Sequence, residues 1–309
     1  WDFAPPGNGN FGPQKDAPRD SRTEIPVFVQ TGNSDFSHVV FRNGLITASH
    51  TVFLPAGGPA TRSAVQWWQL TADGAVVARG RLDDATGQTF YAYSSIAPNR
   101  DNDVLLGYTT YSLQQYPSAG YSFRAASDPP GALRADALLK AGESVYVKTF
   151  GGSRNRWGDY SLTAVDPAND TDLWTIQEYA ALPPQPAPVS YWGTWWGRVV
   201  PDSGPSVPLP IASFGSSATA APAGQPVAFN DTSAGATRWF WNFGDGTSAS
   251  ERDPVHVFQY SGVFSVILNA VNQTGAATAT RSITVGPPAQ AFPQPISRDR
   301  VPRRLTPRR

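Results

Sequence analysis

Residues 239–246, WFWNFGDG, encode a strand that runs directly into a tight turn. Trp239, Trp241 and Phe243 occupy alternate positions, so their side chains lie on one face of that strand. The two glycines that follow permit the positive φ angles that a tight turn needs. Three large aromatic side chains on one face require a facing sheet, because a lone hairpin cannot bury them. The stretch therefore predicts a β-sandwich built around Trp241.

The sequence on both sides of this stretch continues the same alternation. One strand is expected at 226–231, before the turn, and another at 253–258, after it. In the next strand, Phe264, Val266 and Leu268 again occupy alternate positions. Several short strands separated by turn residues are typical of an all-β sandwich.

Residues 212–286 resemble the polycystic kidney disease (PKD) domain family. The resemblance rests on the W-x-F-G-D-G core that starts at Trp241, on the H-x-F pattern at His256, and on the G-x-F-x-V-x-L pattern that starts at Gly262. It implies an immunoglobulin-like sandwich that serves as a spacer or binding module in extracellular proteins, and it does not imply catalysis. The length of the segment suits a seven-strand sandwich.

The composition bounds the size and the partners of the protein. With 309 residues, the chain is long enough for two domains. Lys plus Arg and Asp plus Glu number 24 each, so no overall charge favours nucleic acid or an anionic surface as a partner. No apolar run reaches the length that spans a membrane. Cysteine is absent, which excludes disulfides, thiolate metal sites and a cysteine nucleophile.

The chain begins at Trp1 and contains no methionine. We therefore expect a processed product, the C-terminal part of a longer precursor, or a fragment. Together with the lack of cysteine and the PKD-like unit, this favours a bacterial extracytoplasmic protein, either secreted, periplasmic or at the cell surface.

Residues 25–200 contain a repeated pattern of an apolar strand, a polar loop and an aromatic strand. The three units comprise 45–50 with 65–70, 104–109 with 120–124, and 173–178 with 192–198. Such a pattern is typical of β-propeller blades, each of which is a four-stranded meander. The region resembles bacterial secreted propeller proteins with a sialidase-like fold. The Asp-box of sialidases is absent, which argues against sialidase activity.

A propeller of this size is incomplete. Three to four blades lie at or below the usual minimum, so the domain is expected to leave an unpaired strand edge. Blades from an upstream precursor, strands from another chain, or an ordinary sandwich in place of a propeller would each resolve this. We expect residues 25–200 to contact another polypeptide or a removed segment along such an edge.

The organisation of the chain follows from these units and from its proline-rich stretches. Its expected parts are an extended N-terminal segment (1–24), a propeller-like repeat domain (25–200), a Pro-rich linker (201–211), the PKD-like sandwich (212–286) and an Arg/Pro-rich tail (287–309).

Candidates for catalysis are confined to the carboxylates Asp159, Asp166 and Glu178, because paired carboxylates drive glycoside hydrolysis. The alternative is that these side chains hold turns and neighbouring strands. No serine-hydrolase, phosphate-binding or zinc-protease motif accompanies them. Catalysis is therefore not the expected function.

Oxygen-bearing side chains also gather at Asp166, Asn169, Asp170 and Asp172. Calcium prefers several such oxygens, so this loop is where Ca²⁺ would bind if the protein uses a cofactor. The spacing does not match an EF-hand, and Asp and Asn are also ordinary turn residues. No cofactor is thus the simpler expectation.

Aromatic residues supply the candidate binding surface, namely Trp68, Trp192, Trp195 and Trp196. Exposed indoles stack against sugar rings or contact a protein partner. Adjacent tryptophans in a strand point to opposite faces, so one of each pair is expected in the core.

These observations predict an all-β protein in which a partial β-propeller-like domain precedes an immunoglobulin-like sandwich. The expected function is non-catalytic contact with other protein chains, through strand edges or tails, and with glycans. In the tail, Arg303 and Arg304 are candidates for binding nucleic acid, anionic lipid or an acidic protein groove, and the alternative is a solvated end without a partner. The alternative is the C-terminal part of a secreted carbohydrate-active or proteolytic enzyme, which would need a deep pocket with convergent carboxylates.

Overall fold

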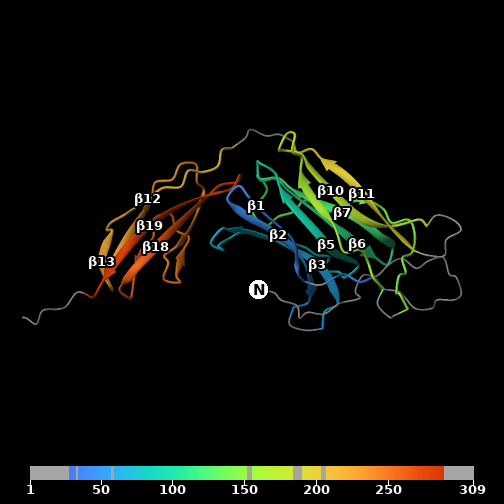
Figure 1. The fold of residues 1–309 in the computed structure, drawn as a ribbon, viewed down its shortest axis with the longest axis horizontal. Coiled ribbons are helices and arrows are strands. Elements are labelled where there is room, and N and C mark those ends of the chain that lie inside the picture. The colour runs from blue at the N-terminus through green and yellow to red at the C-terminus, as the bar shows by residue number, and fades with distance from the viewer. Residues whose placement is uncertain are drawn as a thin grey trace, which may run out of the picture.

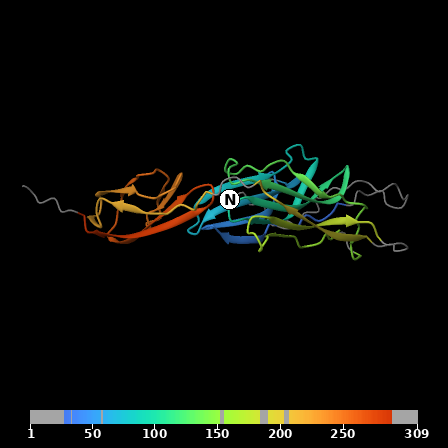
Figure 2. The ribbon, with the colours of Figure 1, turned by 90° about the horizontal axis from the view of Figure 1, so that it is seen from above.

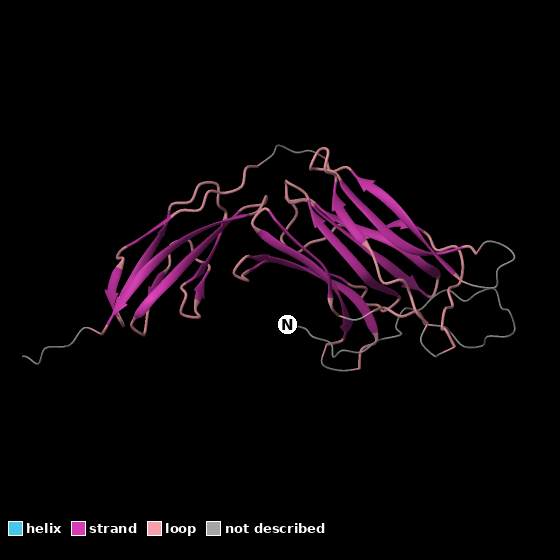
Figure 3. Cartoon of the chain, in the orientation of Figure 1, coloured by secondary structure: helices cyan, strands magenta, loops and turns pink. Residues whose placement is uncertain are grey.

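The structure is a computed structural model that describes residues 28–32, 34–56, 59–151, 155–183, 190–202 and 207–288. These residues form strands and loops only, which confirms the all-β prediction (Figure 3). Two lobes lie end to end along the longest axis and together make an arch (Figure 1, Figure 2). Among the described residues, no helix has the length and apolarity that a membrane crossing needs.

The first lobe contains three antiparallel sheets, each a meander in which neighbours in sequence are neighbours in space. The first sheet consists of β1 (Phe36–Arg42), β2 (Leu45–Leu54), β3 (Arg62–Thr71) and β4 (Val76–Leu82). The second consists of β5 (Thr89–Pro98), β6 (Val104–Ser112), β7 (Gln115–Arg124) and β8 (Ala137–Lys140). The third has β9 (Leu162–Val165), β10 (Leu173–Ala181) and β11 (Tyr191–Val199).

The second sheet is the middle layer of this lobe. On one side, Trp67 of β3 is fully buried in a cluster with Tyr91 of β5 and Tyr108 of β6. On the other side, Leu105 of β6 packs against Leu173 of β10. The three sheets are thus stacked face to face, and the third sheet is left at one end of the stack.

A buried polar layer fixes the third sheet on the middle sheet. The hydroxyl groups of Ser95 and Thr163 lie 2.8 Å apart, and those of Thr163 and Thr175 lie 3.0 Å apart. Gln177 Nε2 donates to Ser95 Oγ over 3.1 Å. A Cβ atom at Gly107 would lie 2.1 Å from that same Nε2, so a glycine is needed where the two sheets approach. These buried hydrogen bonds form in only one position of the third sheet relative to the middle sheet, so they favour that position over others.

The predicted repeat is confirmed at the level of strand pairs. Each of its three units is an antiparallel pair in the structure: β2 with β3, β6 with β7, and β10 with β11. The meanders have the layout of propeller blades, but the resemblance to a propeller remains a prediction. The third sheet has three strands where the others have four.

The second lobe is a sandwich of a three-stranded and a five-stranded sheet. The three-stranded sheet has β12 (Phe214–Ser216), β14 (Pro226–Asp231) and β17 (Val255–Val257). The five-stranded sheet has β13 (Ala220–Pro222), β19 (Ala276–Gly286), β18 (Gly262–Val271), β15 (Arg238–Asn242) and β16 (Ser248–Ala249). The described strands thus number one more than the seven expected, because the two-residue β16 extends the edge beside β15.

Trp241 lies at the centre of this sandwich, as its sequence context predicts. Its ring meets Phe214 edge to face at 5.0 Å and Phe229 at 5.6 Å, and all three side chains are almost fully buried. The indole N–H donates to the Glu251 carbonyl oxygen over 2.9 Å. Phe243 is buried in the same cluster, and Trp239 is partly buried against it. The immunoglobulin-like prediction is therefore confirmed.

The two lobes are joined by a packed junction in addition to the linker. Leu45 and Val77 of the first lobe form a buried apolar cluster with Val271 and Ala276 of the second. The Ala276 N–H donates to the Asn43 carbonyl oxygen over 2.9 Å, a backbone hydrogen bond that crosses the junction.

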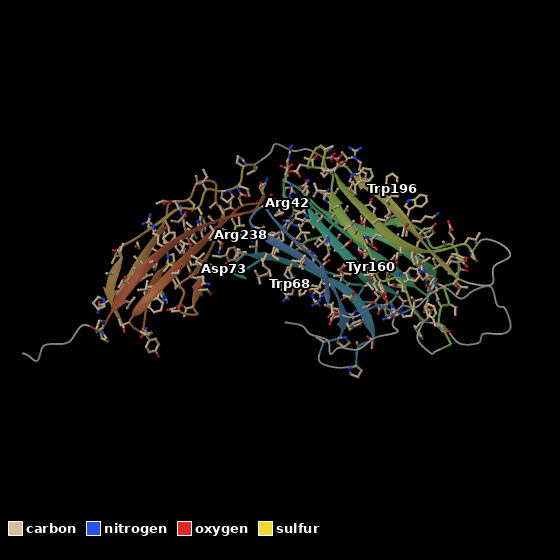
Figure 4. All side chains as sticks on the ribbon, in the orientation of Figure 1. Arg42, Trp68, Asp73, Tyr160, Trp196 and Arg238 are labelled. Atoms are coloured by element: carbon tan, nitrogen blue, oxygen red, sulfur yellow. The ribbon has the colours of Figure 1, made fainter. Side chains whose placement is uncertain are left out.

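Side chains strengthen the junction. Arg238 Nη1 of β15 donates to the Val77 carbonyl oxygen over 2.7 Å, and Figure 4 places Arg238 directly beside the first lobe. The described end of the predicted linker is also held, since Thr274 Oγ1 donates to the Val207 carbonyl oxygen and Asn272 Nδ2 to that of Pro208. The sandwich is thus held in place by direct contacts with the first lobe and by hydrogen bonds to the linker residues Val207 and Pro208.

Candidate binding site

The outer face of the third sheet carries a set of exposed apolar side chains. Its strands are in a register that aligns Leu162, Ile176 and Trp196 in one row across β9, β10 and β11. The neighbouring aligned row of that face contains Ala164 and Trp174. These side chains point away from the middle sheet, because the intervening residues of β10 face it.

An open apolar pocket of about 150 Å³ lies among these side chains, lined by Leu162, Ala164, Trp174, Thr175, Ile176 and Trp196. The ring centroids of Trp174 and Trp196 are 5.2 Å apart and their planes are tilted by 43°. Trp196 is 65% exposed, and Figure 4 shows it at the outer surface of the lobe. Two inclined indoles thus form an apolar floor that is open to solvent.

Polar groups fix one side of this floor. Trp174 Nε1 donates to Asp166 Oδ2 over 2.9 Å, and this bond is the main cause of a lowered pKa of Asp166. Arg198 Nε donates to Asp172 Oδ2 over 2.7 Å, and the guanidinium carbon lies 5.8 Å from the Trp174 ring centroid. The hydrogen bond from Arg198 lowers the pKa of Asp172, so this carboxylate stays ionised at neutral pH. The indole of Trp174 is therefore held in one orientation.

The expectation that one tryptophan of each adjacent pair is in the core is confirmed for the first sheet and wrong for β11. Trp67 is fully buried whereas Trp68 is partly exposed, but Trp195 and Trp196 are 46% and 65% exposed. They do point to opposite faces of β11. Both are exposed because β11 is an edge strand of the third sheet, so neither face is fully covered.

The other tryptophans predicted to bind lie in different places. Trp195 is on the inner side of β11, where its ring meets Tyr179 edge to face and lies 4.9 Å from Lys140 Nζ. Trp192, 43% exposed, occupies the same face as Trp196, four residues earlier in β11. Trp68 belongs to the first sheet, where its Nε1 is 3.3 Å from His50 Nε2 and Arg79 lies over its ring. Arg303 and Arg304 fall outside the described residues.

The predicted carboxylate cluster is divided by the fold. Asp166 directly follows Val165, the last residue of β9, which pairs with Leu173 of β10. Glu178 lies five residues beyond Leu173 in β10, a separation of about 16 Å along the strand. Asp159 Oδ2 accepts a 2.6 Å hydrogen bond from Arg156, and its negative charge acts on Glu178. Only Asp159 and Glu178 are therefore electrostatic neighbours.

Glu178 is unusual among the described carboxylates. Its side chain is only 5% exposed, because the segment around Gly158 covers it. A Cβ atom at Gly158 would lie 1.8 Å from Glu178 Oε2, so the backbone rests directly on the carboxyl group. Burial raises the pKa of Glu178 to about 7, and the negative charge of Asp159 acts in the same direction.

The oxygens predicted to bind calcium have protein donors. Asp166 Oδ1 accepts from the Ala168 N–H, and Asn169 Oδ1 accepts from the N–H groups of Thr171 and Asp172. Asp170 forms an ion pair with Arg42, and Asp172 pairs with Arg198 as described above. Among the described residues, no three His, Cys, Asp or Glu side chains are grouped as metal ligands. Calcium at this loop remains a prediction.

Sequence reasoning missed Trp174, Leu162 and Ile176 as members of the candidate site. An available signal was the alternation in β10, which places Trp174 and Ile176 on one face. Leu162 could not be found in this way, because only the register of β9 on β10 brings it opposite Ile176.

Comparisons with known proteins identify one part of the chain. Residues 212–285 match the family model of the PKD domain, so the second lobe is a PKD domain. A protein from Methanosarcina mazei, solved in solution by NMR, is 28% identical, covers 36% of this chain and 74% of its own, and has a TM-score of 0.24. A search of curated proteins found no match.

A second solved structure is a fungal alcohol oxidase of the AA5 family in complex with copper. It is 15% identical, covers 78% of this chain, and has a TM-score of 0.22. The chain spans 52% of that enzyme's length. At these TM-scores neither structure defines the fold of the first lobe or bears on its activity.

Proposed function

We propose that this chain is a non-catalytic extracytoplasmic binding protein that holds a glycan on the outer face of its third sheet. Trp174 and Trp196 would stack against the apolar C–H face of a sugar ring, with Leu162 and Ile176 completing the floor. The observation that carries this proposal is the open pocket lined by two inclined indoles. A contiguous exposed apolar surface on a protein marks a site of interaction with a ligand or partner.

Three further features support a glycan as the ligand. The pocket has room for about one sugar ring and little more, since it measures about 150 Å³. Asp166 and Arg198 lie beside it and offer acceptors and donors to sugar hydroxyl groups. The PKD domain fits an extracellular setting, and it would act as a spacer next to the lobe that binds the glycan.

The test is a binding titration of the purified chain against a panel of neutral and acidic oligosaccharides. The best ligand should bind the Trp196→Ala variant about tenfold more weakly or worse, because each ring stacked on the sugar contributes a kilocalorie or more. The matched control is Tyr260→Ala, which removes a 79% exposed aromatic ring from the PKD domain. No binding by the wild type to any sugar, or equal losses in both variants, would contradict the proposal.

A second candidate function is favoured by one observation, the raised pKa of Glu178 beside Asp159. A carboxyl group that is protonated near neutral pH is the form that a general acid requires. The chain would then be the C-terminal part of a carbohydrate-active or proteolytic enzyme. The two functions are separated by incubating the bound oligosaccharide with the wild type and with Glu178→Gln: turnover by the wild type alone would establish catalysis.

A further inference from the structure

The outer edge of β11 is a long strand edge without a partner. β11 pairs with β10 over all nine residues, Tyr191 to Val199, with no bulge in the register. Across the described part of the chain, no strand pairs with its other edge. Between Tyr191 and Gly197 the strand contains neither proline nor a charged residue. A long, regular and unpaired edge of this kind is a template for another strand.

The other edge strands of the described sheets carry features that prevent strand addition. In the first sheet, the pairing of β1 with β2 is irregular near Phe36. The pairing of β4 with β3 is irregular opposite Leu70, and β4 carries the charged residues Arg79 and Arg81. β8 and β9 are only four residues long, and the edge strands of the PKD domain are two or three residues long. β5 is long, but most of it is buried between the first and third sheets. Bulges, charges and short length are the usual protections of a sheet edge. β11 is nine residues long without a bulge, and its one charged residue, Arg198, lies next to its end.

The sequence of β11 complements itself. If two copies pair in antiparallel fashion about Thr194, each Thr194 faces the other, Gly193 faces Trp195, Trp192 faces Trp196, and Tyr191 faces Gly197. Aromatic pairs and threonine pairs are favourable across neighbouring strands, and an aromatic ring that covers a glycine compensates for its missing side chain. No two like charges face each other, because Arg198 falls opposite Ser190. These cross-strand pairs favour a second copy of the chain as the partner.

We propose that β11 pairs with β11 of a second copy to form a two-fold dimer with a continuous six-stranded sheet, three strands from each copy. Residues of like parity share a face, so Trp192 of one copy would lie beside Trp196 of the other on the outer face. The two pockets of Trp174 and Trp196 then lie on one surface. This inference goes beyond the proposed glycan binding and does not depend on it.

The first test is the mass of the full chain by analytical ultracentrifugation over a range of concentrations. The wild type should form a dimer, and Thr194→Lys should be a monomer with an unchanged circular dichroism spectrum, because two lysines would face each other at the two-fold axis. A wild type that is monomeric up to its solubility limit overturns the proposal, as does a dimer that persists in Thr194→Lys. If another segment of the same chain covers the free edge of β11, the wild type will be monomeric, and this outcome also overturns the proposal.

The second test uses the absence of cysteine from the chain. Thr194→Cys places one thiol opposite its copy, so mild oxidation should give a disulfide-linked dimer roughly tenfold faster than collision alone or more. The control is Thr284→Cys, an exposed threonine inside the five-stranded sheet of the PKD domain. Equal cross-linking of both variants overturns the proposed register. Glycan binding measured on the monomeric Thr194→Lys variant shows separately whether the binding proposal holds.

Discussion

Asn269 of the PKD domain donates a 2.9 Å hydrogen bond from its Nδ2 to Asp73 Oδ1 of the first lobe, across 196 residues of sequence. The other carboxylate oxygen of Asp73 accepts from Asn242 Nδ2 over 3.3 Å. Figure 4 places Asp73 in the angle of the arch, close to Arg238. One turn residue of the first lobe therefore holds two strands of the second, and the PKD domain has a fixed orientation.

Replacing Asp73 with alanine removes the acceptor for both asparagines. We expect the docking of the PKD domain to weaken by about 1–2 kcal/mol, because hydrogen bonds to a charged acceptor are involved. Calorimetry should separate one unfolding transition into two, and small-angle X-ray scattering should show a longer maximum dimension. Asp73→Asn, which keeps one acceptor oxygen, should lie between the two. Identical scattering profiles for wild type and Asp73→Ala would mean that the junction does not depend on this contact.

The hairpin between β1 and β2 makes a second prediction at the junction. Gly44 has a φ of +72°, and a Cβ atom there would lie 2.0 Å from the Ala276 carbonyl oxygen. Gly44→Ala should therefore push the PKD domain away from the first lobe. Gly74→Ala is the matched control, since Gly74 has a φ of +94° but nothing lies within 4 Å of its Cβ position. Faster proteolysis of the linker is expected in the first variant only; equal rates would contradict the close approach.

The raised pKa of Glu178 predicts that stability falls as pH rises. The neutral form is favoured in the folded chain, so the group's contribution is complete below its ordinary pKa of 4.5 and is lost as pH rises to about 7. Above that pH the buried charge costs about 3 kcal/mol of unfolding free energy. Glu178→Gln should therefore be more stable than the wild type at pH 8 and similar to it near pH 4, as measured by urea denaturation.

Asp159→Asn provides a control for that pH dependence. Its negative charge acts on Glu178, so its removal should lower the midpoint of the stability change without abolishing it. A pH profile of Glu178→Gln that follows the wild type throughout would show that Glu178 is ionised in the folded chain.

In the PKD domain, Asp245 predicts the opposite dependence. Burial alone would raise its pKa, but hydrogen bonds from Thr247 and from His256, 2.8 Å away, outweigh burial and lower it. Its contribution is therefore present above the ordinary pKa of 3.8 and is lost as pH falls below that value. Asp245→Asn should destabilise the domain by about 1–2 kcal/mol at pH 7 and by less at pH 3. An equal effect at both pH values would exclude the ionised carboxylate as the cause.

The sequence predicts the parts of the fold that depend on local alternation. The strand expected at 226–231 is β14 to the residue, and Val266 and Leu268 are buried as their spacing requires. The repeated strand pairs of the first lobe are likewise present. In each case the burial of a residue follows from its neighbours two positions away.

Features that depend on sheet order could not be predicted in this way. Both Trp195 and Trp196 are exposed because nothing described covers the far edge of β11, and the sequence of β11 does not state its place in the sheet. The pocket depends on the register that sets Trp174 beside Trp196. The junction depends on Asp73, which by itself is an ordinary turn residue.

The most direct test of glycan binding is fluorine NMR of the full chain labelled with 5-fluorotryptophan. The chain has ten tryptophans, so ten resonances are expected, and single substitutions assign those of Trp174 and Trp196. We predict that the oligosaccharide found in the binding titration shifts these two resonances far more than those of the buried Trp67 and Trp241. Binding that leaves both unchanged while other tryptophans respond would contradict the assignment of the site to the outer face of the third sheet.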